Sequence, residues 1–399
     1  MDYSNSWILN KIDEICLFVR DGTHGSFKDD DNGIPLLSAK DISDGKIHVY
    51  EDSRRISISD YNTIHKKYEL EIGDILLTIV GTIGRTAMVD NSIKFTLQRS
   101  VAILRTNNEV SNNFIYYYIQ SPTFQKRLKS MVNQSAQGGV YLNSLKKLKI
   151  SIPNDLDEQN KISYFLMQID KKIELLENKY QKYVDFKKYL MQQIFAQNLR
   201  FDFNDDWNVD MIGNNCEVFG RIGFRGYTVD DLVNKGEGAL TIGGKHISKD
   251  YKLDLTSPEY LSLEKYEESP EIKIYNGDVL LVKTASVGKV CFIENLNEKA
   301  TINPQLVVFK NIKLNNKFFY YYLTSNLFQK DIHKIKSTTG IPTITQKELL
   351  NLNILYPSLE EQEIIVNLMS SVDKKISFID KSLKDIEQFK RGLLQQMFV

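Results

Sequence analysis

One stretch of the chain, residues 157–197, places apolar side chains at alternating steps of four and three residues. No Pro or Gly interrupts it. A pattern held for more than four heptads is typical of a long coiled-coil helix, which at about 1.5 Å per residue is roughly 50–60 Å long. The positions are Ile162, Leu166, Ile169, Ile173, Leu176, Tyr180, Tyr183, Lys187, Leu190 and Ile194.

The same pattern returns 203 residues later, from Ile365 to Met397, and the polar position Lys187 recurs as Lys390. Two matching stripes in one chain predict an intramolecular, antiparallel coiled coil. Two alternatives are a pair of core helices in an all-α domain and pairing between two chains. Each lysine falls near a helix C-terminus, where positive charge is favourable, and we expect its long stem to reach out to solvent.

The repeated helix belongs to an internal duplication of the whole chain. The offset between the matching segments stays between 200 and 206 residues. The matching pairs are Trp7 and Trp207, Cys16 and Cys216, 37–42 and 242–247, 73–77 and 277–281, Gly84-Arg85 and Gly288-Lys289, 114–118 and 318–322, 124–126 and 328–330, and Pro153 and Pro357. Residues 43–72 and 248–276 differ almost throughout, as expected of two modules that share a scaffold and read different targets.

Each half contains short β-branched segments that predict strands, at 34–42, 74–80, 86–89, 101–105 and 148–152. Residues 114–131 and 318–335 predict amphipathic helices. Their aromatic runs, FIYYY and FFYYY, suit either nucleobase stacking or packing on a sheet, and we favour packing. The expected fold class is α+β: two similar globular α/β domains joined by two long antiparallel coiled-coil helices with pseudo-two-fold internal duplication. The domains are 1–153 and 199–357, and the helices are 154–198 and 358–399.

Composition and motifs argue against several functions. Three widely spaced cysteines show no disulfide framework, the N-terminus shows no signal peptide, and apolar runs are too short for a membrane, so we expect a cytoplasmic protein. No phosphate-binding loop is present. The five histidines lack metal-ligand spacing and are expected at isolated surface or loop positions. The chain therefore looks like a binder without catalytic residues or a metal site.

Local basic stretches favour DNA as the ligand, although the net charge is zero. Residues 126–149 contain no acid, and an amide-rich loop lies between their lysines. Lys and Arg neutralise phosphates, while amides and hydroxyls read base edges. A solvated polar hairpin, or exposed charges at strand ends for Arg85 and Lys289, would explain the same residues. The candidates for DNA contact are Lys40, Arg85, Gln98, Arg99, Gln134, Gln137, Gly138, Gly139, Lys146, Lys245, Lys289, Gln305, Thr338, Thr339, Gly340 and Thr343.

Taken together, these segments resemble the specificity (S) subunit of type I restriction–modification systems. The resemblance rests on GDILLTIVGTIGR (73–85) with GDVLLVKTASVGK (277–289), on residues 133–153 with 337–357, and on the helix starts DEQNKI and LEEQEII. The shared tetrapeptide DKKI, at 170–173 and 373–376, completes it. The order and the duplication of these segments extend over the whole chain.

The resemblance implies two target recognition domains, each of which reads one half of a bipartite, asymmetric sequence in double-stranded DNA. It also implies helices that set the spacing and dock two methyltransferase (M) subunits, with restriction (R) subunits able to join. Catalysis, S-adenosylmethionine, ATP and Mg²⁺ would then belong to the partner subunits, and none to this chain. Alternatives are a non-catalytic protein-binding scaffold and a specificity subunit of another modification system. The target bases, the gap and the methylated base stay open.

Overall fold

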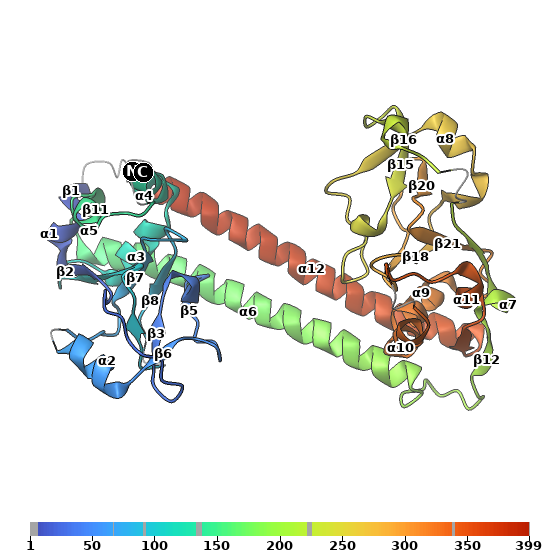
Figure 1. Ribbon diagram of the computed structural model, residues 1–399, viewed down its shortest axis with the longest axis horizontal. Helices are drawn as coiled ribbons and strands as arrows, with labels where there is room; N and C mark the ends of the chain where they lie inside the picture. Colours follow the sequence, from blue (N-terminus) through green and yellow to red (C-terminus); the bar gives the residue numbers. More distant parts are fainter. Residues whose placement is uncertain are drawn as a thin grey trace. The chain divides into compact units, whose positions relative to one another are not determined.

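The computed structural model describes residues 7–66, 68–90, 93–132, 138–221, 226–336 and 340–398. The chain divides into two compact units (Figure 1). Unit 1 combines Met1–Asn178 with Asp380–Val399, and unit 2 is Lys179–Ile379. Each unit therefore holds one globular domain together with a part of each long helix.

The domain of unit 1 is built on a four-stranded sheet in the order β2-β10-β7-β8, whose neighbouring strands run antiparallel. Smaller sheets, β1-β11, β6-β3-β9 and β4-β5, lie in the same unit. The strands are β1 (Trp7–Lys11), β2 (Cys16–Asp21), β3 (Ile34–Leu37), β4 (Ile42–Ser43), β5 (Lys46–Ile47), β6 (Arg55–Ile56), β7 (Ile75–Thr78), β8 (Thr86–Met88), β9 (Thr96–Leu97), β10 (Val101–Thr106) and β11 (Lys149–Pro153). The helices of this domain are α1 (Ile12–Ile15), the 3-10 turn η2 (Ala39–Asp41), α2 (Ile58–His65), α3 (Asn112–Gln120), α4 (Pro122–Val132) and α5 (Leu142–Lys146).

The domain of unit 2 repeats this frame with the sheet β13-β21-β18-β19 and the pair β12-β22. It differs in a five-stranded sheet, β14-β16-β15-β20-β17. The strands are β12 (Asn208–Met211), β13 (Glu217–Phe219), β14 (Leu232–Val233), β15 (Gly238–Ile242), β16 (Glu259–Ser262), β17 (Lys273–Ile274), β18 (Val279–Val282), β19 (Val290–Phe292), β20 (Ala300–Ile302), β21 (Leu306–Lys310) and β22 (Asn353–Tyr356). The helical elements are α7 (Ile212–Asn215), η4 (Val229–Asp231), η5 (Gly244–His246), α8 (Leu263–Glu267), η6 (Pro270–Ile272), α9 (Asn316–Thr324), α10 (Asn326–Ile335) and α11 (Gln346–Leu350).

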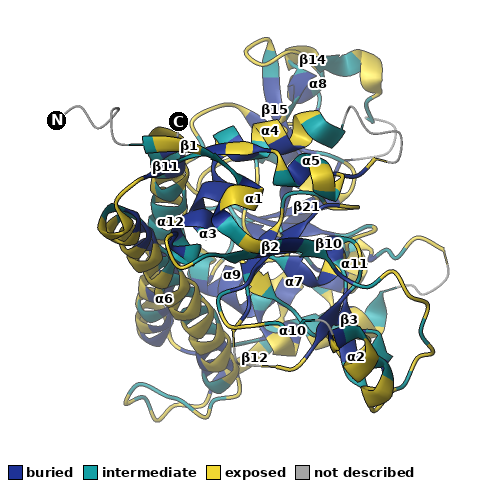
Figure 2. Cartoon of the chain, turned by 90° about the vertical axis from the view of Figure 1, so that its left-hand side faces the viewer, coloured by how far each residue is buried: buried dark blue, intermediate teal, exposed yellow. Residues whose placement is uncertain are grey.

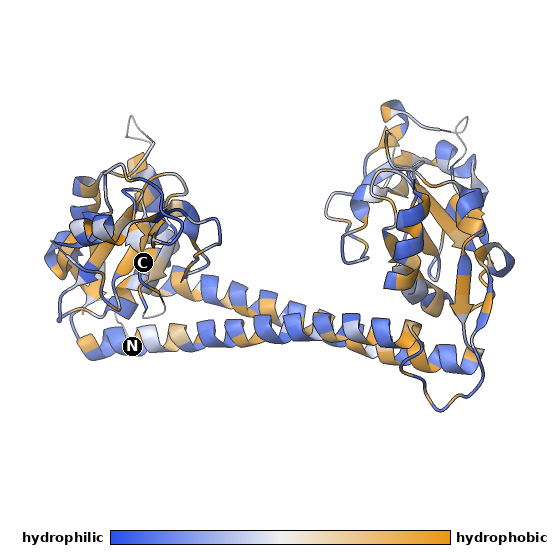
Figure 3. Cartoon of the chain, turned by 60° about the horizontal axis from the view of Figure 1, so that its bottom comes forward, coloured by the Kyte–Doolittle hydropathy of each residue, from blue (hydrophilic) through white to orange (hydrophobic). Residues whose placement is uncertain are grey.

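The extra strands of unit 2 fall where the two halves of the sequence diverge. Residues 248–276 contribute β16 and β17, whereas residues 43–72 contribute β5, β6 and the helix α2. The shared segments form the central sheets, whose strands are hydrophobic (Figure 3). The expected α+β class and the shared scaffold with divergent insertions are confirmed.

The two long helices are α6 (Leu156–Phe195) and α12 (Leu359–Met397), each within three residues of its predicted ends. Acidic residues occupy the first turn of both helices, where they favourably oppose the positive end of the helix dipole. In unit 1 the start of α6 packs with the end of α12, and in unit 2 the end of α6 packs with the start of α12. The helices therefore pair antiparallel within each unit, as the heptads predict.

A terminal aromatic side chain joins each helix pair to its domain. Phe398 follows α12 and contacts Phe114 and Tyr118 of α3 with ring centroids 5.3 and 5.4 Å away. Phe195, its duplicate in α6, lies 5.8 Å from Phe318 in the same manner. The runs FIYYY and FFYYY are largely buried in these cores, so packing explains them and base stacking by the buried rings is excluded.

Three local predictions are wrong. Residues 114–131 form two helices, α3 and α4, because Pro122 forces Ser121 into an extended conformation (ψ 146°). Residues 318–335 likewise break at Ser325, which caps α10 by accepting a hydrogen bond from the Phe328 N–H. The predicted strand 34–42 is interrupted by η2, since Asp41 folds back to accept the Ser38 N–H at 2.7 Å.

Lys187 and Lys390 also differ from expectation. Their side chains do not reach out to solvent. Each ammonium pairs across the helix–helix contact of its own unit, Lys390 with Asp170 at 2.6 Å and Lys187 with Asp373 at 2.7 Å. A polar heptad position that finds a carboxylate on the facing helix fixes helix register. In the described part of the chain, no helix has the length and apolar character needed to cross a membrane.

Candidate nucleic-acid interface

Several motif residues shared by the two halves hold the framework. Asp74 of the GDILL segment is 1% exposed and receives the Arg105 guanidinium at 2.8 Å. Asp278 pairs with Lys310 at the equivalent place. Buried charges require partners, and these ion pairs join the end of β7 to β10 and the end of β18 to β21. This framework role explains both aspartates without a contact to DNA.

Four glutamines perform a second framework role. Gln125 donates to the carbonyls of Gly84 and Ile119 at 2.9 and 2.8 Å, and Gln329 repeats both bonds in unit 2. Gln159 and Gln362, from the two helix starts, donate to the carbonyls of Pro153 and Pro357, respectively. The shared FQK and EQ motifs thus fix turns and helix starts in each unit.

Arg85 and Lys289 follow glycines whose φ is +93° in both halves. Each basic side chain donates to a backbone carbonyl at the end of a neighbouring turn, Arg85 to Ile42 at 3.3 Å and Lys289 to Ile247 at 2.8 Å. The sequence did not predict that these side chains hold the neighbouring turns in place. Each side chain keeps further N–H donors that could bind a phosphate, so phosphate binding by these residues stays a prediction.

Lys40 and Lys245 are the exposed residues of two equivalent, otherwise buried turns, η2 and η5. A later loop supports each turn through a side chain: the Ala39 N–H donates to Ser100 Oγ at 3.1 Å. In unit 2 the Gly244 N–H donates to Gln305 Oε1 at 3.2 Å. The backbone arrangement is the same, and the side chain that supports it differs. This juxtaposition brings Lys40 beside the loop of Gln98 and Arg99, and Lys245 beside Gln305.

In unit 2 these turns line an open cavity of about 340 Å³, whose lining residues are mostly of polar types. Lys245, Lys289 and Gln305 line it, so the structure brings together three predicted residues of the second half. Lys245 pairs with Glu259 at 2.6 Å. The other lining residues are Gly244, Thr284, Ala285, Ser286 and Asn303. Ammonium, amide and hydroxyl groups can donate to phosphate oxygens, and amide, hydroxyl and carboxylate groups can read base edges.

Asn303, Ser286 and Glu259 were absent from the predicted set. Asn303 was detectable from the sequence, because it occupies the position that Gln98 holds in the first half. Glu259 gave no such signal, since it lies in the divergent segment. Its place in the cavity depends on the five-stranded sheet that only the fold reveals.

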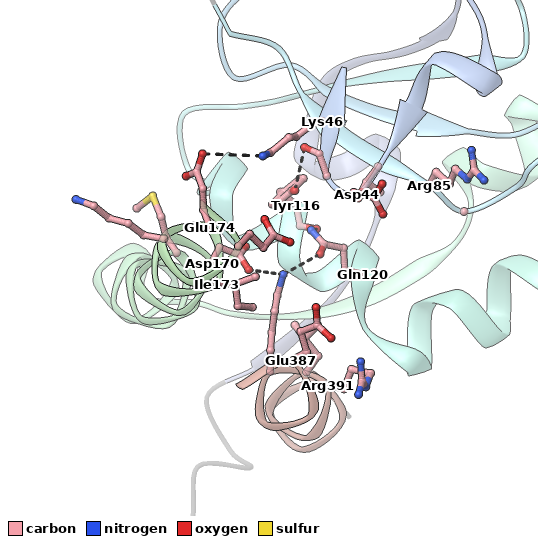
Figure 4. Close-up of a pocket in the computed structure, with 18 of the residues that line it drawn as sticks. Asp44, Lys46, Arg85, Tyr116, Gln120, Asp170, Ile173, Glu174, Glu387 and Arg391 are labelled. Carbon is pink, nitrogen blue, oxygen red and sulfur yellow. Dashed lines mark hydrogen bonds and ion pairs between the residues drawn. The ribbon is translucent and has the colours of Figure 1, made fainter. Parts of the chain in front are cut away.

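In unit 1, Arg85 lines a larger groove of about 1070 Å³ between the domain and the two helices (Figure 4). Basic side chains from the domain, such as Lys46, face acidic ones from α6, such as Glu174, with 3.9 Å between the two charged groups. Asp44, Asp170, Glu177 and Glu387 add further carboxylates. The mixed charge makes this groove a poor phosphate channel.

The described residues include only part of each predicted amide-rich loop. Gln134, Gln137, Thr338 and Thr339 lie outside the described residues. Gly139 forms a bridge with Val80, and Thr343 forms the equivalent bridge with Thr284. Gly138 and Gly340 have positive φ and open space around them. Lys146 ends α5 and is partly exposed. Both loops thus return to the strand end that leads to Arg85 or Lys289.

Two histidines contradict the expected surface or loop positions. His65 is 7% exposed and contacts Thr96 Oγ1 at 2.9 Å. His246 is 2% exposed and accepts the Gly243 N–H at 2.9 Å. Among the described residues, no cluster of three or more His, Cys, Asp or Glu could hold a metal ion. Burial also raises the pKa of the thiols of Cys16, Cys216 and Cys291 to about 12.

Comparisons with known proteins agree with the duplicated architecture. The family model described as "Type I restriction modification DNA specificity domain" matches residues 6–182 and 223–388. A Methanocaldococcus jannaschii protein provisionally named type I restriction enzyme MjaX specificity subunit is 26% identical, with 97% of this chain and 92% of that protein aligned. The MjaVIII specificity subunit of the same organism is 22% identical over 90% of this chain and 84% of its own length.

A solved structure has the same fold. The crystal structure of a type I restriction–modification S subunit from M. genitalium superposes with a TM-score of 0.61 at 16% sequence identity. The match covers 100% of this chain and 98% of that one.

Proposed function

Because the chain belongs to the type I restriction–modification DNA specificity family, we propose that it reads one half of a bipartite, asymmetric DNA target with each globular domain. The observation that most supports this proposal is the pair of equivalent turns, η2 and η5, each held by a side chain from a later loop. Lys40 and Lys245 sit on equivalent backbones, yet Ser100 supports one turn and Gln305 the other. Equal scaffolds with different side chains are suited to reading two different half-sites.

The two long helices act as the spacer in this proposal. Their antiparallel pairing within each unit supports a rigid connection, because a continuous heptad core resists bending. The helix length then sets the gap between the half-sites. A spacer of roughly 50 Å corresponds to up to about 15 base pairs.

The helices also carry the docking surface for two methyltransferase subunits. Large apolar side chains are exposed at duplicated positions: Leu175 and Phe378 are 61% and 65% exposed, and Phe186 and Phe389 are 45% and 53% exposed. Each unit contains one member of each pair, since Leu175 and Phe389 belong to unit 1. Exposed faces of α6 and α12 are visible in Figure 2. Repeated apolar sites of this kind suit two copies of one partner.

Catalysis takes place outside this chain. S-adenosylmethionine binds the methyltransferase subunits, and ATP and Mg²⁺ serve the restriction subunits where these join the complex. What this chain supplies is the choice of sequence, the gap and the docking surface.

Methylome sequencing of cells that carry the chain with its methyltransferase subunit tests the proposal. Methylation confined to one bipartite, non-palindromic motif is expected. A gel shift with DNA, run with and without that subunit, distinguishes the alternatives. If the chain shows no sequence preference for DNA in either state, a protein-binding scaffold is the remaining function.

The docking surface has a separate test. Phe186→Glu with Phe389→Glu should abolish co-purification of the methyltransferase subunit. Tyr164→Glu is the matched control, because Tyr164 is 60% exposed on α6 and its duplicate position holds Asn367. Equal loss with the control would contradict a duplicated docking site.

A further inference from the structure

Each unit contains a three-residue contact that joins its domain to both long helices. In unit 1, Asp170 of α6 accepts the phenol of Tyr117 (α3) on Oδ2 at 2.8 Å and the ammonium of Lys390 (α12) on Oδ1 at 2.6 Å. In unit 2, Asp373 of α12 accepts Tyr321 (α9) on Oδ2 and Lys187 (α6) on Oδ1, each at 2.7 Å. We call each set a clamp.

The two clamps are duplicates of one another in every member. Asp170 and Asp373 are the first residues of the shared DKKI tetrapeptides, and the lysines are the matched polar breaks of the heptad pattern. In each clamp the ammonium also faces the tyrosine ring, at 5.5 Å in unit 1 and 5.7 Å in unit 2. Figure 4 shows Asp170 of α6 and Gln120 of α3 near one another in the groove. The Lys390 ammonium contacts both side chains.

The clamps are partly enclosed and strongly polar. The tyrosine residues are 3% and 0% exposed, and the lysine side chains are 17% and 25% exposed. Burial, followed by the neighbouring aspartate charge, raises the pKa of both phenols. The phenols therefore remain hydrogen-bond donors, and hydrogen bonds to a charged acceptor are directional and short.

Position along the helix gives the clamp a mechanical role. Lys390 lies eight residues before Phe398, the apolar anchor of unit 1, which is about 12 Å along α12. Lys187 lies eight residues before Phe195 in the same way. Further apolar residues of both helices pack into the same domain core around each anchor. Apolar packing is non-directional, so it permits small changes of tilt. A directional contact slightly more than two turns away restricts that tilt.

We propose that the two clamps are positioning devices that hold each recognition domain at a fixed tilt on the spacer and so confine the protein to one gap length between the half-sites. This proposal rests on the proposed function. Base pairs are spaced by about 3.4 Å, so a domain that rocks by a few ångströms accepts a neighbouring gap. The clamps leave the identity of the half-sites unchanged, because none of their residues lines the cavity of unit 2 or supports the turns at Ala39 and Gly244. Asp170 and Lys390 do line the unit 1 groove that Arg85 shares, which is a poor phosphate channel.

The test uses Tyr117→Phe with Tyr321→Phe, which removes two hydroxyl oxygens and keeps both rings. The full chain with its methyltransferase subunit selects from duplexes that carry the wild-type half-sites at the native gap and at gaps one and two base pairs longer or shorter. The preference for the native gap over its neighbours should fall by about tenfold, the ratio equivalent to one charge-assisted hydrogen bond. The selected half-sites should not change.

Lys187→Gln with Lys390→Gln provides a second test of the same clamps should the tyrosine variant fold poorly, with folding followed by circular dichroism. Lys171→Ala with Lys374→Ala is the matched control, because these exposed residues follow the aspartates in both DKKI segments. Folded clamp variants that keep the wild-type gap preference would overturn the proposal. A wild-type chain that prefers no bipartite sequence would instead overturn the proposed function.

Discussion

Phe398 lies edge-on against Phe114, with ring centroids 5.3 Å apart and ring planes at 66°. The contact joins the last turn of the chain to the helix that covers the sheet of unit 1, and neither ring is exposed. Phe195 makes the duplicate contact with Phe318 in unit 2. Sequence-distant ends of the two spacer helices are therefore integral to the domain cores.

Phe398→Ala should destabilise unit 1 strongly, because it leaves a cavity between Phe114 and Tyr118. A loss of about 3–5 kcal/mol in the free energy of unfolding is expected. Urea denaturation followed by circular dichroism measures it. Phe389→Ala on the same helix is the control, since that side chain is 53% exposed and surface changes cost about 0.5 kcal/mol or less. Similar losses for the two variants would contradict the anchor role.

Unit 1 should lose stability in mild acid through His65. Burial lowers the pKa of its imidazole, against weaker opposing effects of the Tyr68 carbonyl and Glu69. The folded form therefore binds the proton less readily than the unfolded chain, whose pKa is about 6.5. Stability from the neutral ring is present above that pH and is lost as the pH falls through the lowered folded value.

His65→Gln provides the comparison for this pH effect. The amide preserves polar contacts toward Thr96 and Tyr68 but does not titrate. Urea midpoints measured from pH 7.5 to pH 5 should fall less for the variant than for the wild type. Parallel curves would show that other groups account for the acid sensitivity.

Gln305→Ser should change base preference without unfolding the turn. Ser100 supports the equivalent turn of unit 1 through its hydroxyl, so serine can replace the supporting oxygen while removing the amide donor from the cavity. Loss of one base contact costs about 1–3 kcal/mol of discrimination. Methylome sequencing should show one relaxed position in one half-site and an unchanged second half-site. A change in both half-sites would contradict the assignment.

Lys245→Ala should weaken DNA binding uniformly across sequences. Its exposed ammonium lines the cavity and pairs with Glu259, and we expect it to neutralise one phosphate when DNA binds. The slope of log affinity against log salt should decrease in magnitude by about 1. Titrations at several salt concentrations measure this slope, and Lys249→Ala, at an exposed lysine four residues along the chain, serves as the control.

Much of the fold was predictable because its signals are local or repeated. The heptad pattern predicted α6 and α12 within three residues. The break before Pro122 was missed, although the proline that causes it is a local signal. The clamp was harder to predict. Asp170 and Lys390 form an ion pair only when the two helices pack in one particular register, which the sequence does not specify. The repetition of the DKKI segment and of the lysine indicates only that these positions share a role. The support of Gly244 by Gln305 requires the chain to return 61 residues later, and no local pattern encodes that return.

Removing one heptad from each helix tests the spacer directly. Deleting 176–182 and 379–385 preserves the heptad register and leaves both clamps and the four exposed apolar residues in place. Each helix becomes shorter by about 10 Å, which is about three base pairs. The preferred gap should shorten by that amount while the half-sites stay the same, as measured by selection from duplexes of varied gap. If the recognised half-sequences changed while the gap persisted, the helices would not set the spacing.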